Sequence, residues 1–207
     1  AKSHPEYSII SCRQLGENGK ERRAAGKFPG MNKHGINERK PVDSVSFPDW
    51  VSGSLMMMKK EAFHNLKGFD ESFWMYYEDV DLCLRARIAG GEIAFYNDIT
   101  IEHENGGSSR IDLKTTSITK SEVQASRHLY IHKHLKGFKR IIFHILVILD
   151  NLIIGILIGV IGLISFEPKL FVRFLLLLRL IEYYIGSLFR RSWMSPRSVK
   201  FKVTDRL

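Results

Sequence analysis

The sequence predicts an α/β domain followed by a helical hairpin, and two observations carry this prediction. Over the first two thirds of the chain, short apolar runs alternate with segments of helical character that end at glycines. Residues 141–166 and 170–189 are then almost entirely apolar, and Pro168 lies between them. Because proline cannot continue a helix from the preceding turn, we expect two helices joined by a short connection. We therefore divide the chain into residues 1–137 and 138–207.

Local signals define the elements of the first part. Glycines that follow the helical segments, such as Gly68 and Gly90, serve as C-terminal caps. Cys12 and Cys83 are too few for a disulfide framework and are expected to be small buried side chains. In chain order, we expect a strand at 7–12, helices at 60–66 and 78–89, a strand at 93–96, a second apolar segment at 99–101 that leads into His103, and a helix at 121–136. The helix at 78–89 is expected to bury one stripe, made of Val80, Cys83, Leu84, Arg87 and Ile88.

The sequence of the apolar hairpin is compatible with more than one arrangement relative to a membrane. The uninterrupted apolar core of its first helix, residues 152–164, is 13 residues long, which is short of the roughly 20 that cross a bilayer. Adding residues 141–149 reaches that length but buries Asp150 and Asn151. The hairpin can lie in the membrane without crossing it, cross it twice, or form the core of a soluble oligomer. In each case three small residues are expected to permit close packing on the second helix, namely Gly155, Gly159 and Gly162.

The net charge of +9 is concentrated on either side of the hairpin. Basic residues beside apolar helices are typical of proteins on an anionic membrane surface, and both clusters lie at the open end of the hairpin, which we assign to the cytoplasmic face. No pattern of a nucleic-acid-binding module is visible, so nucleic acid is not an expected partner. The clusters are Lys133, Lys136, Lys139 and Arg140 before the hairpin, and Arg190, Arg191, Arg197, Lys200, Lys202 and Arg206 after it.

An acidic pair follows an aromatic loop between Gly68 and Arg85. Glu78 and Asp79 would open a helix, where free backbone N–H groups and the helix dipole keep carboxylates ionised. An ionised carboxylate beside aromatic surface suits a general base that takes the proton of a sugar hydroxyl. Acidic residues at helix starts are also common caps, and Asp81 with Arg85 is an i,i+4 pair that contributes a few tenths of a kcal/mol. Asp79 and Asp81 match a metal-binding Asp-x-Asp pattern, but positions two apart on a helix point to different sides.

Residues 68–85 resemble the acceptor-site motif of the family 2 glycosyltransferases, in particular of their rhamnosyltransferase-like branch. That motif reads Gly-Phe-Asp-Glu, then aromatic residues and Tyr, then Glu-Asp-x-Asp-Leu and a later Arg. Further matches occur in the same order as in the family, and together they cover about residues 7–137. These matches are residues 50–56, 59–63, 103–109 and 126–133.

The resemblance implies an α/β chain that forms the acceptor-side half of a GT-A nucleotide-sugar transferase fold, followed by a membrane-associated helical hairpin. It also implies inverting transfer of a sugar, rhamnose in this branch, from a nucleotide diphosphate sugar to a hydroxyl of a lipid-linked or cell-envelope glycan. Asp79 is then the catalytic base, Glu78 orients the acceptor or the helix start, and His103 is one ligand of a divalent cation, Mn²⁺ or Mg²⁺. The expected acceptor-binding residues are Trp50, Gly53, Ser54, Trp74 and Tyr76, with backbone N–H groups of the glycine and serine facing substrate.

The donor-binding half that the resemblance implies is not recognisable in residues 1–50, which contain no Asp-x-Asp. We therefore expect the 207 residues alone to be inactive. Two alternatives remain: a non-catalytic, membrane-bound glycan- or partner-binding remnant, and a structural membrane protein whose acidic helix start is only a cap. His128, His132 and His134 have no adjacent cysteine or acidic ligand, so a solvated basic surface is expected there rather than a zinc site.

Overall fold

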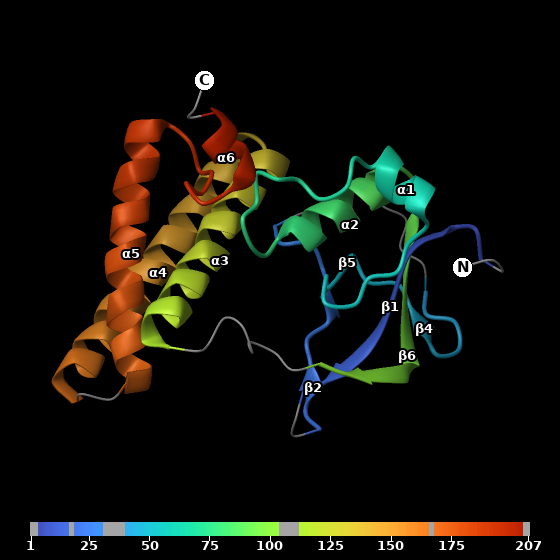
Figure 1. The fold of residues 1–207 in the computed structure, drawn as a ribbon, viewed down its shortest axis with the longest axis horizontal. Coiled ribbons are helices and arrows are strands. Elements are labelled where there is room, and N and C mark those ends of the chain that lie inside the picture. The colour runs from blue at the N-terminus through green and yellow to red at the C-terminus, as the bar shows by residue number, and fades with distance from the viewer. Residues whose placement is uncertain (1–3, 17–18, 31–39, 104–111, 166–167, 205–207) are drawn as a thin grey trace. The chain divides into compact units, whose positions relative to one another are not determined.

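Figure 1 shows the computed structural model of the chain, which describes residues 4–16, 19–30, 40–103, 112–165 and 168–204. The chain forms two compact units. The first consists of Ala1–Asp70 and Glu78–Asn105, and the second of Glu71–Tyr77 and Gly106–Leu207. The helix before residue 137 packs on the second helix of the hairpin, and the domain boundary that we expect at residue 137 stays a prediction.

The first unit is built on a four-stranded sheet in the order β2-β1-β6-β4. Its two long central strands, β1 (Tyr7–Leu15) and β6 (Glu92–Glu102), run parallel, so their carboxyl ends lie at the same edge of the sheet. The short strands β2 (Glu21–Arg22) and β4 (Val45–Ser46) pair antiparallel with β1 and β6 respectively. The unit therefore mixes parallel and antiparallel pairing, as expected for an α/β protein.

Both central strands are predicted by the sequence, and their lengths differ from the prediction. The strand expected at 7–12 continues to Leu15, and the segments expected at 93–96 and 99–101 form the single strand β6. The pairing absorbs the residues between those two segments, because Cys12 pairs with Tyr96 whereas Arg13 pairs with Thr100. Such a register shift bends a strand and redirects its end.

A two-stranded ribbon and two helices complete the first unit. The ribbon pairs β3 (Ala25–Gly26) with β5 (Trp50–Val51), and the helices are α1 (Lys60–Asn65) and α2 (Glu78–Ile88). Both helices are confirmed to within a residue of the expected end. Gly68 ends α1 in a left-handed conformation, with φ of 65° and its N–H bonded to the Phe63 carbonyl, as a C-terminal cap requires.

Helix α2 is buried on most of its circumference rather than on one stripe. Ile88, expected in that stripe, is 69% exposed, so this part of the prediction is wrong. Asp81 and Leu82, expected outside it, are fully buried. The helix packs against β5, β6 and β1, so its surroundings decide burial more than its own periodicity. Cys12 and Cys83 are buried free thiols, as predicted.

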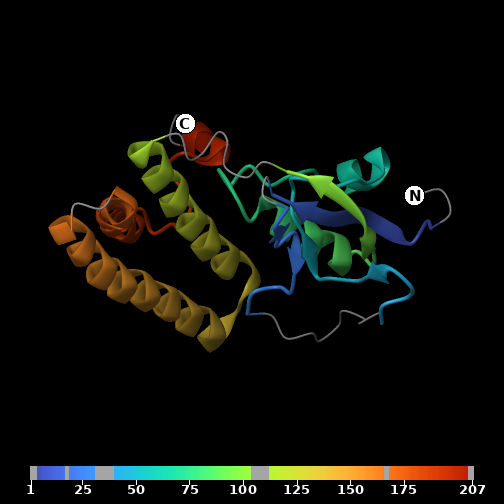
Figure 2. The ribbon, with the colours of Figure 1, turned by 90° about the horizontal axis from the view of Figure 1, so that it is seen from below.

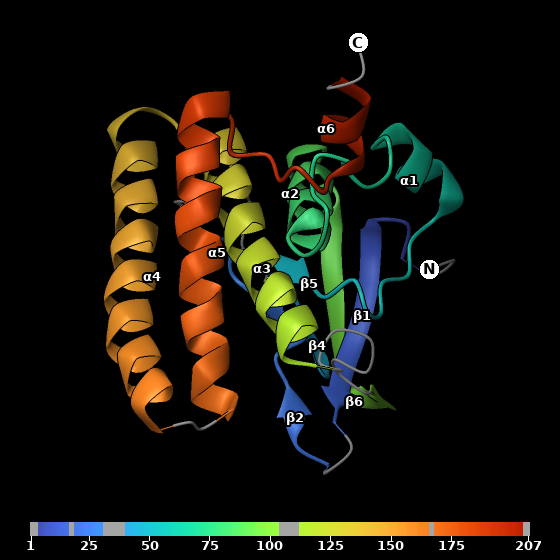
Figure 3. The same cartoon turned by 60° about the vertical axis from the view of Figure 1, so that its left-hand side comes forward.

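The second unit is helical, with α3 (Leu113–His134), α4 (Gly137–Ser165), α5 (Pro168–Arg190) and α6 (Val199–Thr204). The two helices predicted on either side of residue 166 are confirmed as α4 and α5, which lie side by side (Figures 2 and 3). A Cβ on Gly155 would lie 3.0 Å from the Leu177 side chain, and one on Gly162 would overlap the Leu170 backbone at 2.5 Å. The expected close glycine packing is therefore confirmed at these two positions.

His128 corrects the prediction of a solvated histidine cluster. Its side chain has no exposed surface. Its Nδ1 lies 2.8 Å from Nδ1 of His144, its Nε2 lies 3.2 Å from the Tyr184 hydroxyl, and its ring stacks on Trp193. Burial, then the nearby His144, lowers the pKa of His128 to about 3, so the ring is neutral at physiological pH. The prediction failed because the partners of His128 come from residues 144–193, far along the chain.

Candidate functional site

Asp79, the second residue of α2, is held by two backbone N–H groups. The Gly53 N–H donates to its Oδ2 at 2.8 Å, and the Val80 N–H donates to its Oδ1 at 2.8 Å. A Cβ on Gly53 would lie only 3.3 Å from Cβ of Asp79, so this approach favours a glycine. Because each oxygen accepts one of these bonds, the carboxylate plane is fixed and each oxygen retains acceptor capacity.

The turn that carries Gly53 is tied to the sheet through side chains. The Ser54 hydroxyl donates to Oε1 of Gln14 on β1 at 2.9 Å and lies 2.9 Å from the Ser52 hydroxyl. The Ser52 N–H bonds to the Ala24 carbonyl next to β3. Sequence reasoning missed Gln14 and Ser52. Gln14 is a polar amide in a strand whose alternate positions are buried, and this pattern could have indicated a buried hydrogen-bonding role. In the structure Gln14 is only 3% exposed.

The backbone N–H groups of Gly53 and Ser54 have acceptors within the chain. The Gly53 N–H donates to Asp79, and the Ser54 N–H donates to the Ser52 hydroxyl at 3.4 Å. These groups support the carboxylate and the turn, and the expected contact of Gly53 and Ser54 with an acceptor stays a prediction.

Burial, and not the helix dipole, dominates the protonation of the acidic pair. The pKa of Glu78 is raised to about 7, first by burial and then by the neighbouring Asp79 carboxylate. The pKa of Asp79 is also raised by burial, and the bonds from Gly53 and Val80 oppose that rise. The prediction that the helix start keeps both groups ionised is therefore wrong for Glu78, which is about half protonated near neutral pH. Among the described residues, Oε2 of Glu78 is a buried oxygen without a hydrogen-bond partner.

Asp81 contributes more to the structure than the surface ion pair that its spacing from Arg85 predicts. Its side chain is fully buried and bonds to Nε of Arg85 at 2.7 Å, while the two other Arg85 nitrogens bond to the carbonyls of Leu66 and Gly68. The pair therefore joins α2 to the end of α1 and is not a surface pair worth a few tenths of a kcal/mol. Asp79 and Asp81 bond to different partners, Asp79 to backbone N–H groups and Asp81 to Arg85.

Trp50 is fixed at the edge of the ribbon. Its indole N–H donates to the Lys27 carbonyl at 3.0 Å, and the Arg23 guanidinium lies 5.8 Å from its ring centre. The ring covers Gly26, where a Cβ would approach it to 3.0 Å. Trp50 is partly exposed, which is compatible with either a structural or a binding role.

Trp74 and Tyr76 belong to the segment that folds with the helical unit. Both are more than a third exposed, at 36% and 38%. The Arg197 guanidinium lies 6.0 Å from the Trp74 ring centre. Tyr76 and Tyr77 both adopt left-handed φ values, 63° and 68°, which cost on the order of 1–2 kcal/mol for each non-glycine residue. Strained backbone of this kind is common at functional sites.

The strained loop is held in place on both sides of its two tyrosines. The Ser126 hydroxyl donates to the Met75 carbonyl at 2.7 Å, and the Tyr77 ring lies 5.5 Å from the Tyr130 ring. These contacts offset the unfavourable backbone conformation immediately before Glu78.

His103 lies at the carboxyl edge of the two parallel strands, where its N–H donates to the Leu15 carbonyl at 2.8 Å. Ligands of α/β proteins commonly bind at such an edge. Within the described part of the chain, however, no group of three or more His, Cys, Asp and Glu side chains is arranged to hold a metal ion. The rest of the expected motif, residues 104–109, lies outside the described residues. The described residues alone thus do not form a cation site, and the role of His103 stays a prediction.

Comparisons with known proteins converge on this part of the chain. Residues 43–105 match the sequence family described as the N-terminal domain of galactosyltransferase. All eight predicted site residues, which run from Trp50 to His103, lie inside this match. No solved structure matches the chain.

Individual relatives agree with the family match. The chain is 38% identical over 93 residues to rhamnosyltransferase WbbL of Escherichia coli, an alignment that covers 38% of this chain and 35% of that protein. It is 36% identical over 63 residues to the N-acetylglucosaminyl-diphospho-decaprenol L-rhamnosyltransferase of Mycobacterium tuberculosis, covering 30% of this chain and 20% of that enzyme. It is 35% identical over 94 residues to the low-salt glycan biosynthesis hexosyltransferase Agl10 of Haloferax volcanii, covering 39% and 28%.

These relatives share a class of activity, and the chain matches a fifth to about a third of the length of each. The family match points to glycosyltransferases, and the acceptor-site motif and the two relatives named as rhamnosyltransferases point to the rhamnosyltransferase-like branch. The matched part of this chain is a partial region of a family 2 glycosyltransferase of the rhamnosyltransferase-like branch.

Proposed function

We propose that this chain supplies the acceptor site and the catalytic base of an inverting glycosyltransferase. The enzyme would transfer a sugar from a nucleotide diphosphate donor to a hydroxyl of a lipid-linked or cell-envelope glycan. One observation supports this most directly: the Asp79 carboxylate is fixed by the N–H groups of Gly53 and Val80 at the start of α2. A base held this way loses little entropy when the acceptor arrives.

In the proposed reaction, Asp79 accepts the proton of the acceptor hydroxyl as its oxygen attacks the anomeric carbon. The new glycosidic C–O bond forms on the face opposite the leaving group, and the bond to the nucleoside diphosphate breaks with its electron pair on the diphosphate. This single displacement inverts the anomeric configuration. The pKa of Asp79, raised by burial, makes it a better proton acceptor than an ordinary aspartate.

Glu78 is proposed to orient the acceptor. Its buried Oε2 has no hydrogen-bond partner among the described residues, and an unsatisfied buried oxygen favours a ligand that donates a hydrogen bond. A sugar hydroxyl is such a donor. Trp50, Trp74 and Tyr76 are proposed to contact the apolar face of the sugar, because all three rings have exposed surface.

Family 2 glycosyltransferases generally use divalent cations, and His103 is proposed as one ligand of Mn²⁺ or Mg²⁺. The described residues do not complete such a site. A single imidazole needs carboxylate support to hold such a cation.

The donor sugar and the location of the enzyme are further parts of the proposal. Two relatives are named as rhamnosyltransferases, and one of them is named for a decaprenol-linked substrate. We propose rhamnose as the sugar and the cytoplasmic face of the membrane as the location. In the described part of the chain, one helical stretch, Gly137–Ile158, is long and apolar enough to cross a membrane.

The test is a transfer assay with the intact transferase, a panel of nucleotide diphosphate sugars and a polyprenyl-diphosphate-linked N-acetylglucosamine acceptor. We expect transfer from nucleotide diphosphate rhamnose, and a product whose anomeric configuration, measured by NMR, is opposite to that of the donor. A product with retained configuration would contradict the single displacement. A lack of transfer from every donor would instead favour a non-catalytic glycan-binding role.

A further inference from the structure

Helix α4 exposes an unusually large apolar surface. Only 11% of its membrane-compatible stretch is buried in the chain, so α4 is not a core helix of the second unit. Asp150 is the single charged residue between Arg140 and the end of α4. The apolar residues of α4 that are at least 37% exposed are Phe138, Ile141, Ile142, Ile145, Leu146, Leu149, Ile153, Ile154, Ile156, Leu157, Ile161 and Ile164.

Three polar side chains of the hairpin bond to α3, namely His144, Asn151 and Arg179. The Asn151 amide donates to Gln124 at 3.3 Å and to the Tyr184 hydroxyl at 2.9 Å. His144 bonds to His128 of α3, and Nε of Arg179 on α5 donates to the Ser117 hydroxyl of α3 at 2.8 Å. Polarity is thus divided across the helices, with apolar side chains outward from α4 and polar ones toward α3.

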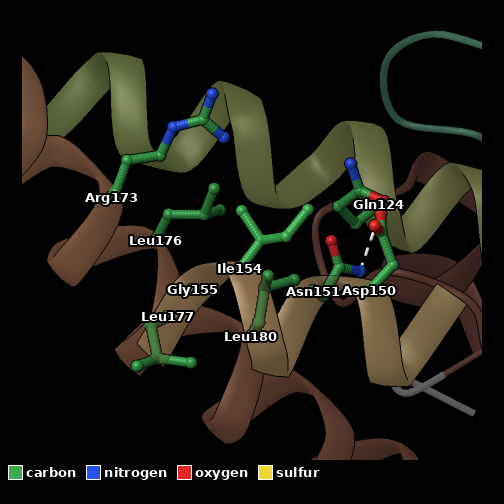
Figure 4. A pocket seen from close by; sticks show the side chains of 9 residues that line it. All are labelled: Gln124, Asp150, Asn151, Ile154, Gly155, Arg173, Leu176, Leu177 and Leu180. Atoms are coloured by element: carbon green, nitrogen blue, oxygen red, sulfur yellow. Dashed lines mark hydrogen bonds between the residues drawn. The ribbon is translucent and has the colours of Figure 1, made fainter. Parts of the chain in front are cut away.

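A groove between the three helices also separates polar from apolar side chains. It has a volume of about 110 Å³ and is lined by residues of α3, α4 and α5. Arg173 lies at one end of the groove, and Gln124, Asp150 and Asn151 lie at the other, with leucine and isoleucine side chains between them (Figure 4). The charged groups of the hairpin that line the groove therefore face α3 and not the outer surface of α4.

Helix α3 cannot be separated from α4 in the membrane. Only Leu135 and Lys136 connect the two helices, and bonds join residues that lie progressively farther from this connection, His128 to His144 and Gln124 to Asn151. The contact between Gln124 and Asn151 lies 14 residues into α4 from Gly137, or about 21 Å along the helix. A crossing α4 would therefore draw much of α3 into the hydrocarbon core. That helix carries charges along its whole length, namely Lys114, Lys120, Glu122, Arg127 and Lys133.

We propose that α3, α4 and α5 lie flat in one leaflet of an anionic bilayer. The outer face of α4 contacts the acyl chains, α3 faces the headgroups and water, and both ends of the hairpin stay on one side of the membrane. An in-plane helix separates its polarity across its axis, whereas a spanning helix separates it along its axis. Phospholipid headgroups match the basic residues at the open end, which are Lys133, Lys136, Lys139, Arg140, Arg190, Arg191, Lys200 and Lys202.

This inference rests on the membrane association proposed above and is independent of sugar transfer. Its first test is flotation of the purified chain with vesicles of phosphatidylcholine and phosphatidylglycerol. Ile153→Glu, on the outer face of α4 at 54% exposure, should weaken binding by about tenfold or more. Ile88→Glu, at 69% exposure on α2, is the matched control and should bind as the wild type does. Equal binding by both variants, or a wild-type chain that stays in solution as an oligomer, would overturn the proposal.

The second test distinguishes lying from crossing. Ile164→Cys, near the hairpin tip, and Phe138→Cys, at the start of α4, are both more than 70% exposed, at 73% and 76%. The native Cys12 and Cys83 are buried, so each variant can be labelled selectively with an NBD dye. After binding to preformed vesicles, external dithionite should reduce both dyes. Protection of the dye at Ile164→Cys alone would show a crossing hairpin. That outcome would overturn the in-plane arrangement but leave membrane association and the proposed transfer intact.

Discussion

Arg85→Met should destabilise the protein strongly, because it removes the guanidinium that bonds to the buried Asp81 carboxylate. The Asp81 side chain has no exposed surface and lies 2.7 Å from Nε of Arg85, which is 26% exposed. The same change removes the bonds from Arg85 to the carbonyls of Leu66 and Gly68 at the end of α1. The substitution therefore removes the link between α1 and α2 and takes one charged partner from a buried carboxylate.

The magnitude follows from the geometry. Unit charges 2.7 Å apart attract by roughly 6 kcal/mol at an effective dielectric constant of about 20. Desolvation of the pair offsets part of this attraction, and removal of one partner of a buried pair costs about 3–5 kcal/mol. We expect Arg85→Met to lower the free energy of unfolding by that amount, a large fraction of the roughly 5–15 kcal/mol typical of a domain.

The assay is urea unfolding followed by tryptophan fluorescence. The matched control is Arg13→Met, because Arg13 pairs with Glu21 at 3.1 Å on the surface, with side chains 38% and 58% exposed. Such an exposed pair should be worth about 0.2–1 kcal/mol. If Arg85→Met lowers the free energy of unfolding no more than Arg13→Met does, the pair of Asp81 and Arg85 is not a structural link. Metal binding by Asp81 would then be the better explanation of its position.

Three further predictions concern the site. The pKa of Glu78 is raised from 4.5 to about 7, so the folded state binds more protons in that window, and stability should fall as pH rises through it. Glu78→Gln should remove that fall in urea midpoints measured from pH 4 to 8; an unchanged pH profile would contradict the raised pKa. Gly53→Ala should lower kcat about tenfold with little change in unfolding free energy, since its Cβ would lie 3.3 Å from Cβ of Asp79; normal turnover would mean that this contact does not position the base. His103→Ala should raise the metal concentration for half-maximal activity, and an unchanged metal titration would return it to a structural role.

Local signals account for the elements that the sequence predicts well. Helix α1 is followed by Lys67 and Gly68 and helix α2 by Gly90, all with positive φ, and glycine meets this requirement without strain. The helix break at Pro168 follows equally from its missing N–H group. These features depend only on neighbouring residues, so a single sequence reveals them.

The start of α3 was not predictable from apolar periodicity. The helix begins at Leu113 and not at residue 121, because the Asp112 side chain accepts a bond from the Thr115 N–H at 2.7 Å. The first two turns are polar, so an apolar pattern cannot detect them. The cap itself, an aspartate three residues before a threonine, was the available signal.

Tertiary contacts explain what the sequence could not predict in the site. The helix-dipole argument predicts an ionised Glu78, yet burial raises its pKa. Gln14 supports the Gly53 turn from a strand that lies some 40 residues earlier in the chain. His128 is neutral because residues of α4 and α5 enclose it. Each effect depends on residues far apart in the sequence, which spacing rules do not relate.

The most direct test of the account is the turnover of Asp79→Asn in the intact transferase. Asparagine retains the shape of the side chain, and its one amide oxygen can accept one of the two N–H bonds from Gly53 and Val80, each 2.8 Å long in Asp79, but it cannot take the acceptor proton. We predict that kcat falls by at least about 10²-fold, the scale for losing a general base, while the free energy of unfolding falls by only about 1–3 kcal/mol, the cost of one lost hydrogen bond. Turnover close to that of the wild type would remove Asp79 from the mechanism. A variant that fails to fold would show that the carboxylate is a helix cap and not the base.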